Sequence, residues 1–101
     1  MSITLVSCPP EHADCLARSL VDARVAACVS VLPRLRSVYR WQNAVEHADE
    51  ALLVIKHPSA AFEAVRSAVL QAHPYELPEI VAVSVDKVHP PYLDWILASC
   101  S

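Results

Sequence analysis

Glycine is absent from this chain of 101 residues. Walker A loops and dinucleotide fingerprints depend on glycine, because only a residue without a Cβ lets the backbone approach a phosphate group so closely. The absence therefore argues against a nucleotide-dependent enzyme of the usual designs.

Long hydrophobic runs are also absent. A membrane span needs about 20 consecutive apolar residues, and Glu, Arg, Lys or His interrupts every apolar run of this chain. The first eight residues are too short for a signal peptide and have no basic start. We expect no membrane span and a cytoplasmic location.

Basic charge is scarce. The formal net charge is −3, and the isoelectric point is about 5.9, so nothing indicates a nucleic-acid partner. Only Arg34, Arg36 and Arg40 gather on one stretch, and in a strand they would share a face. That face is either solvated or an anion-binding surface.

The cysteines form no metal-binding motif. Cys8, Cys15, Cys28 and Cys100 include no CxxC pair and no zinc-finger spacing to a histidine. In a protein that is not exported they are expected to be reduced thiols, packed in the interior.

Apolar residues are abundant for a chain of this size. They make up 54% of the sequence, and the mean hydropathy is +0.33. A single domain over residues 1–101 hides only roughly two-thirds of its unfolded surface. We therefore expect part of the apolar surface to lie against other copies of the chain.

Periodicity predicts alternating strands and helices. The predicted strands are 2–7, 26–32 resuming at 35–41, 48–57 and 80–85, with a turn at 42–44. The predicted helices are 10–24, 58–73 and 92–98, each preceded or opened by proline. Pro33 predicts an edge strand or a bulge. Two βαβ halves joined by a long hairpin, plus a C-terminal helix, make an α+β, ferredoxin-like domain.

The predicted helices each carry an apolar stripe. We expect these side chains to pack inward: Leu16, Leu20 and Ala23; Phe62, Val65 and Val69; Leu93, Ile96 and Leu97.

Four segments together resemble the CutA divalent-cation tolerance family. They are Ala26-Ala27-Cys28-Val29, Tyr39-Arg40-Trp41-Gln42, His73-Pro74-Tyr75-Glu76-Leu77-Pro78-Glu79-Ile80 and Tyr92-Leu93-Asp94-Trp95. Their order and spacing are specific, and the likeness covers nearly the whole chain. The resemblance implies a tight homotrimer of ferredoxin-like subunits, tolerance of copper and other divalent cations, and a trimer architecture similar to PII signalling proteins.

Two positions depart from the family pattern. Similar proteins usually carry Asn where this chain has Ser30, and Gly where it has Asn43. Asn43 preserves the chemistry of the turn, because Asn tolerates the left-handed conformation. Ser30 removes a polar ligand near Cys28 and weakens a metal site there.

Cys28 and His73 are the candidate metal ligands. A thiolate suits soft ions such as Cu(I), and Cys28 lies within a family segment; the alternative is a buried strand thiol. His73 lies at a helix end before a proline-bounded loop, where it either caps the helix or contacts a ligand.

A second set of residues belongs to segments that converge in the family fold. They combine aromatic rings, a lysine and carboxylates, which is typical of a small-ligand pocket or of an oligomer interface. They are Tyr39, Trp41, Lys56, Tyr75, Glu76, Glu79 and Trp95. The other histidines, His12, His47, His57 and His89, have no partner spacing and are expected on the surface.

Three classes of function follow. The first is a trimer that binds copper or other divalent ions, and the second is a PII-like small-molecule sensor. The short turn at Gln42 and Asn43 argues against the second, because a PII-like protein would carry a long signalling loop there. An enzyme using His73, Glu76 and Glu79 is the third, but no nucleophile–base pair is apparent, and we expect no catalysis.

Overall fold

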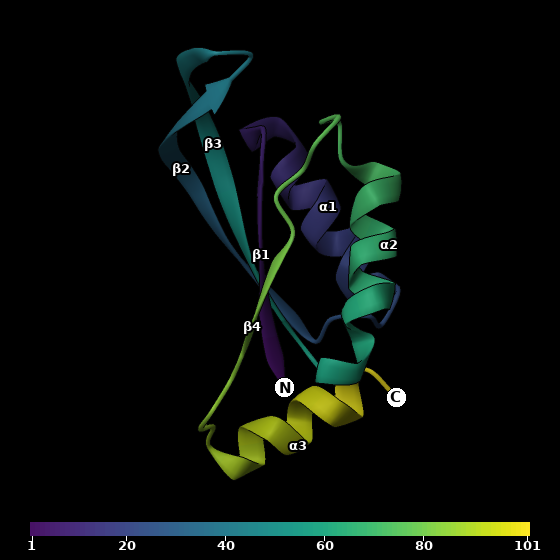
Figure 1. Ribbon diagram of the computed structural model, residues 1–101. Coiled ribbons are helices and arrows are strands. Elements are labelled where there is room, and N and C mark those ends of the chain that lie inside the picture. The colour runs from purple at the N-terminus through teal and green to yellow at the C-terminus, as the bar shows by residue number, and fades with distance from the viewer.

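A four-stranded antiparallel sheet forms the centre of the computed structural model, which describes residues 1–101 (Figure 1). The elements are β1 (Ser2–Cys8), α1 (Pro10–Asp22), β2 (Cys28–Trp41), β3 (Ala44–His57), a 3-10 turn (Ser59–Ala61), α2 (Phe62–Ala72), β4 (Val81–Ser84) and α3 (Pro90–Ser99). The strand order is β2-β3-β1-β4, and every neighbouring pair is antiparallel. The prediction of an α+β domain is confirmed. None of the helices combines the length and the hydrophobicity that a membrane span requires.

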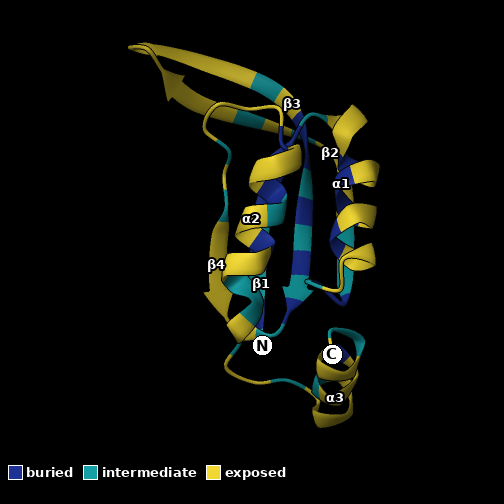
Figure 2. Cartoon of the chain, turned by 90° about the vertical axis from the view of Figure 1, so that its right-hand side faces the viewer, coloured by how far each residue is buried: buried dark blue, intermediate teal, exposed yellow.

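Helices α1 and α2 cover the same face of the sheet (Figure 2). The hydrophobic core lies beneath them, because strand side chains alternate between the faces and the inward set is apolar. Its fully enclosed members are Val6, Cys8, Leu20, Ala51, Leu53, Ile55, Val65 and Val69. Helix α3 packs at one end of the sheet rather than on this face (Figure 2) and buries only Ile96 completely.

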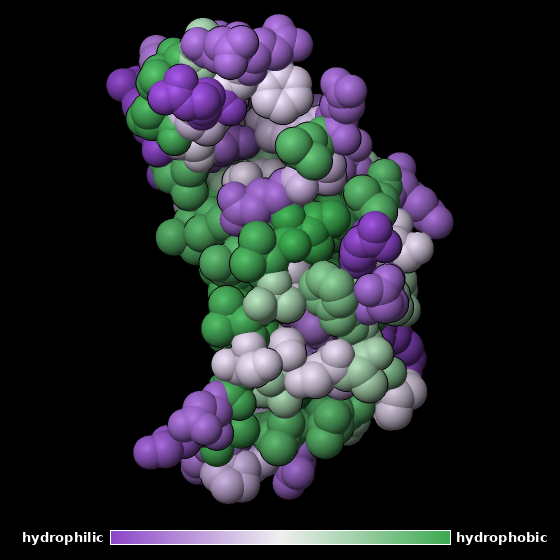
Figure 3. Space-filling view, viewed as in Figure 1, coloured by the Kyte–Doolittle hydropathy of each residue, from purple (hydrophilic) through white to green (hydrophobic).

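The opposite face of the sheet has no helix over it. Direct pairing places Leu5 of β1 beside Val54 of β3 and Val81 of β4, so these side chains share the uncovered face. The same register adds Ile3, Val83, Leu52 and Leu32. Val81 and Val83 are each about half exposed. Figure 3 shows hydrophobic residues across the middle of the molecule, where β1 and β4 cross in Figure 1.

Strand β2 contains the irregularity that proline predicts. Its pairing with β3 shifts register between Leu32 and Leu35, and the exposed Pro33 lies inside this bulge. Pro33 lacks an amide hydrogen for the ladder, and β2 lies at the edge of the sheet, so the break costs little. The predicted interruption at Pro33 is confirmed.

The hairpin between β2 and β3 is longer than predicted. Gln42 and Asn43 have φ values of 49° and 67°, which make a two-residue turn in the left-handed region. Strand β3 therefore starts at Ala44 and not at the predicted residue 48. Beyond the bulge the hairpin projects from the domain, and residues 35–50 are called the arm below.

Three predicted core positions are wrong. Helix α1 ends at Asp22, because Arg24 turns into the left-handed region at φ 60°, and Ala23 is left exposed. Leu97 on α3 is 47% exposed, and Cys15 on α1 is exposed instead of packed inside. Periodicity located these helices correctly but not the edge of each buried stripe.

His57 is buried, whereas the sequence predicted a surface position. It lies at the end of β3 and is fully enclosed. Its Nδ1–H donates to the Pro58 carbonyl oxygen at 2.7 Å, and its Nε2 lies 2.7 Å from the Thr4 hydroxyl, which donates to it when the ring is neutral. Burial lowers the pKa of His57, an effect that the Pro58 hydrogen bond partly offsets.

The lowered pKa predicts a loss of stability in mild acid. Below about pH 6.5 the unfolded chain protonates this histidine while the folded chain does not, so the free energy of unfolding falls as the pH drops through the folded pKa. We expect His57→Gln to flatten this part of the stability profile, measured by urea denaturation between pH 7.5 and 4.5 at fixed protein concentration. His12→Gln, at an exposed position, is the control and should keep the wild-type slope.

Candidate functional site

A cavity of about 750 Å³ lies between the arm and the segment of residues 73–80. Figure 2 shows this segment leaving the end of α2 near the base of the arm before it descends to β4. The cavity is lined by Ser7, Ser37, Val38, Tyr39, Arg40, Trp41, Glu50, Pro74, Tyr75, Glu76, Leu77 and Glu79. Residues far apart in sequence therefore meet at one hollow of a single chain.

Five of the seven predicted ligand residues line this cavity: Tyr39, Trp41, Tyr75, Glu76 and Glu79. Lys56 and Trp95 do not. Lys56 is paired with Ile3 and Cys28, away from the arm, and the Trp95 ring stacks on Tyr92 within α3 at a centroid distance of 5.6 Å. A single chain does not bring all seven together, and a ligand role for Lys56 and Trp95 stays a prediction.

Glu50 is a cavity residue that sequence reasoning missed. Glu50 lies on the same face of β3 as Leu52 and Val54, which are half-buried apolar residues. The pattern of the strand therefore predicts another apolar residue at position 50, where the chain has a carboxylate. That break in the alternation was the available signal. Glu50 is only 5% exposed, and its Oε2 accepts a hydrogen bond of 2.8 Å from the Tyr75 hydroxyl.

Tyr75 is held as a neutral donor. Burial raises the pKa of its phenol, and so does the neighbouring Glu50 carboxylate, both by hydrogen bonding and by charge. The hydroxyl therefore stays protonated through the physiological range. The 73–80 segment is thus anchored to β3 by a donor that does not titrate there.

His73 anchors the same segment to β1. His73 is 9% exposed; its ring Nε2 lies 2.7 Å from the Ser7 carbonyl oxygen, and its Nδ1 accepts the Tyr75 amide hydrogen at 3.1 Å. A carbonyl can only accept, so the proton lies on Nε2 and the ring is neutral. A metal ion at His73 would have to replace one of these two bonds. Its role as a ligand stays a prediction.

Cys28 lies on the uncovered face of the sheet, half-buried, opposite Lys56 in the ladder. The Lys56 ammonium donates to the Ser30 hydroxyl at 2.6 Å and lies 3.8 Å from the Cys28 sulfur. No three His, Cys, Asp or Glu side chains of the chain come close enough to hold a metal ion. A metal site at Cys28 therefore needs ligands beyond one chain.

The other cysteines lie apart from this face. All four thiols are free; Cys8 is buried within the core, and Cys100 is half-buried near the end of α3. Burial raises the pKa of both thiols, and Glu50 and Glu11 add to the effect at Cys8. Both are therefore poorer thiolate donors at neutral pH than an unperturbed cysteine.

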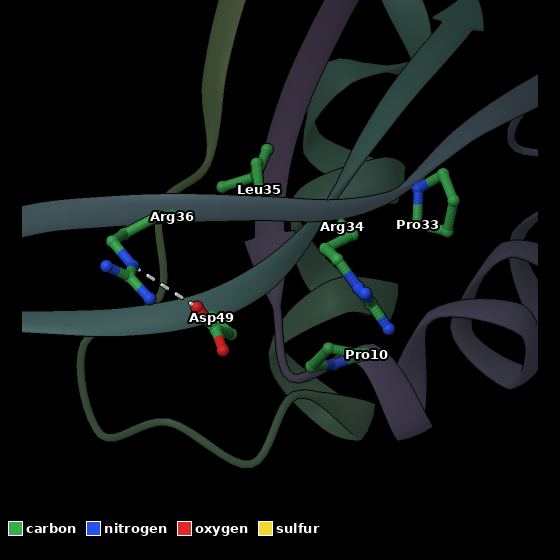
Figure 4. Close-up of a pocket in the computed structure, with 6 residues that line it drawn as sticks. All are labelled: Pro10, Pro33, Arg34, Leu35, Arg36 and Asp49. Atoms are coloured by element: carbon green, nitrogen blue, oxygen red, sulfur yellow. Dashed lines mark hydrogen bonds and ion pairs between the residues drawn. The ribbon is translucent and has the colours of Figure 1, made fainter.

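Arg34 and Arg36 line a second hollow at the base of the arm (Figure 4), whereas Arg40 lines the first cavity. The second hollow measures about 570 Å³ and is lined by Pro10, Pro33, Arg34, Leu35, Arg36 and Asp49. The Arg36 Nε donates to Asp49 Oδ1 at 3.5 Å, and both side chains are about two-thirds exposed. Such an exposed pair contributes little. An anion-binding role for these arginines stays a prediction.

The Tyr75–Glu50 bond yields a direct test of the cavity wall. Tyr75→Phe leaves the Glu50 carboxylate buried without its donor, and we expect a loss of about 1–3 kcal/mol in the free energy of unfolding. Tyr39→Phe removes a hydroxyl that makes no hydrogen bond within the chain and should change stability by less than about 0.5 kcal/mol. Urea denaturation of both variants measures the difference; equal values would mean that the bond does not anchor the segment.

A family model described as CutA1 divalent ion tolerance protein matches residues 2–99. The divalent-cation tolerance protein CutA of Thermus thermophilus is 41% identical over 95 residues, which are 93% of this chain and 92% of that protein. Protein CutA of the mouse is 39% identical over 97 residues, 95% of this chain, but the chain spans only 55% of its length.

A solved structure shares the fold as well. It is described as the PII-like protein CutA from Nostoc in apo form, and it superposes with a TM-score of 0.95 at 33% sequence identity. The superposition covers 100% of this chain and 98% of that one.

Proposed function

The chain belongs to the CutA1 divalent ion tolerance family, and we propose that it acts as a homotrimer of ferredoxin-like subunits that binds copper or other divalent metal ions. The proposal includes no catalysed reaction, because the names of the relatives describe tolerance and both ring nitrogens of His73 are already occupied.

We place the protein in the cytoplasm. Four free thiols suit a reducing compartment. The names of two relatives give other locations: a chloroplastic CutA of Arabidopsis thaliana and a periplasmic CutA of Archaeoglobus fulgidus.

The observation that carries the proposal is the apolar, uncovered face of the sheet. Leu5, Val54, Val81 and Val83 lie there with no helix over them, and the backbone edge of β4 is open to pairing. Exposed apolar patches and open edges mark association surfaces. Copies of the chain that packed through this face would bury the apolar excess of the composition.

Cys28 lies on that same face, which links assembly to metal binding. One chain offers a thiol there but no further soft or acidic ligands beside it. Three copies brought together by this face would supply several thiolates, a ligand set that suits Cu(I) and other soft ions. The metal is thus proposed to bind where subunits meet.

Assembly is tested by sedimentation equilibrium at micromolar concentration, where we expect about three times 11.1 kDa. Val83→Glu places an unpaired carboxylate on the uncovered face and should dissociate the trimer, because burying that charge is costly. Val21→Glu, at a similarly exposed valine on helix α1, is the matched control and should stay trimeric. A wild-type monomer at this concentration would refute the proposed assembly.

Metal binding is tested by anaerobic Cu(I) titration against a competing chelator. Cys28→Ser should weaken binding at least about tenfold, whereas Cys15→Ser, an exposed thiol on α1, should leave it unchanged. Lys56→Met should strengthen Cu(I) binding several-fold. The substitution removes an ammonium group that lies 3.8 Å from the Cys28 sulfur and would repel a metal cation bound there. Unchanged affinity in Cys28→Ser would leave this thiol as a packing residue and turn attention to His73.

A PII-like small-molecule sensor is the second candidate, and the cavity beside the arm favours it. Tyr39, Trp41 and Tyr75 line it together with carboxylates, which is the usual composition of a small-ligand pocket. The two-residue turn at Gln42 and Asn43 leaves no long signalling loop. Equilibrium dialysis against copper, zinc and a panel of nucleotides separates the two candidates.

A further inference from the structure

The cavity beside the arm carries an unbalanced negative charge. Three carboxylates line it, those of Glu50, Glu76 and Glu79, against a single guanidinium from Arg40. The ion pairs of the chain join Arg18 to Asp14, Arg36 to Asp49 and Arg66 to Glu63, and none of them includes a cavity carboxylate. An anionic ligand would therefore meet repulsion from most of the charged lining.

Glu50 is the cavity carboxylate that a bound cation would stabilise most, because it is buried. It is 95% shielded from solvent, and its only hydrogen-bond donor within the chain is the neutral phenol of Tyr75, at Oε2. Its Oε1 has no hydrogen-bond partner within the chain. Because every side-chain oxygen that is fully shielded from solvent has such a partner, Oε1 must be accessible, and we take it to be reached from the cavity. A carboxylate so deeply placed is costly unless a positive charge approaches it.

The rings of the cavity favour an organic cation. Tyr39, Trp41 and Tyr75 line the cavity and are 43%, 41% and 37% exposed, so part of each side chain is accessible to a ligand. The faces of such rings attract ammonium groups and cover the methylene groups attached to them. A simple metal ion would use none of this apolar surface.

The spacing of the carboxylates also argues against a single metal ion. No three His, Cys, Asp or Glu side chains converge closely enough to coordinate one. Charges separated along a flexible chain can instead reach carboxylates that lie apart. The two uncompensated negative charges match a ligand with two positive ones.

We propose that this cavity binds a small organic dication of the protonated aliphatic diamine class. One ammonium group donates to the free Oε1 of Glu50, the second lies near Glu76 and Glu79, and the methylene chain passes over the Tyr39 and Trp41 rings. The inference rests on the small-molecule-sensing candidate and names its ligand class. It requires neither trimer assembly nor metal binding.

Isothermal titration calorimetry with 1,4-diaminobutane tests the proposal on the full chain. We expect a Kd of about 1 mM or tighter, weaker binding of the monoamine 1-aminobutane, and no binding of the uncharged 1,4-butanediol. Glu50→Gln should weaken diamine binding about tenfold or more, because a charge-assisted hydrogen bond becomes a neutral one. Glu46→Gln, an exposed arm carboxylate outside the cavity lining, should bind as the wild type does.

Two further variants complete the test: one guards against misfolding, and the other tests the role of the aromatic ring. If circular dichroism shows that Glu50→Gln does not fold, Glu76→Gln takes its place, because Glu76 is exposed and its loss should not affect folding. Trp41→Leu keeps an apolar side chain but removes the ring face, and it should weaken the diamine more than it weakens nucleotide or metal binding.

The outcomes separate this inference from the proposed function. No heat with the diamine, equal affinity in Glu50→Gln, or displacement of the diamine by equimolar Mg²⁺ would overturn it. Cu(I) binding retained in the same preparation would then leave the metal proposal standing. Binding of AMP without the diamine would keep small-molecule sensing and refute only the ligand class.

Discussion

The pairing of β3 with its two neighbours is the constraint on which the other features depend. β3 pairs with β2 along the whole hairpin and with β1 over its second half, from Ala51 to His57. Because side chains alternate in a strand, this register sends Leu53 and Ile55 to the helices and Val54 and Lys56 to the uncovered face. A slip by one residue would exchange the core with the association surface.

The loop that closes the cavity is held by polar groups rather than by apolar packing. His73 donates to the Ser7 carbonyl, and Tyr75 donates to the Glu50 carboxylate, so the 73–80 segment is fastened to two strands. Buried polar groups with good partners specify one arrangement, because any other leaves them unsatisfied. This explains how a segment with two prolines and no helix or strand holds a defined wall for the cavity.

The two proposed binding regions lie at different places on the same side of the sheet. Lys56 places a positive charge beside Cys28, whereas Glu50, six residues earlier in β3, places a negative charge beneath the arm. The first region is incomplete in one chain and suits a ligand shared between copies. The second is a hollow between the arm and the 73–80 segment, where aromatic rings and carboxylates suit a small organic molecule. Metal tolerance and small-molecule sensing are therefore compatible in this fold.

The sequence by itself determined the elements and their order. Hydrophobic periodicity, the prolines and Asn43 act on the backbone through local preferences that depend on only a few neighbouring residues. The sequence located the bulge at Pro33, the turn at Asn43 and five residues of the cavity, the last through the resemblance of their segments to a known family. Only the tertiary structure decided that His57 is buried, that Glu50 forms the cavity wall and that Lys56 and Trp95 lie elsewhere. The physical reason is that burial and convergence depend on contacts between residues distant in sequence. The Thr4 hydroxyl on β1 hydrogen-bonds to His57 at the end of β3, and Tyr75, which follows α2, donates a hydrogen bond to Glu50.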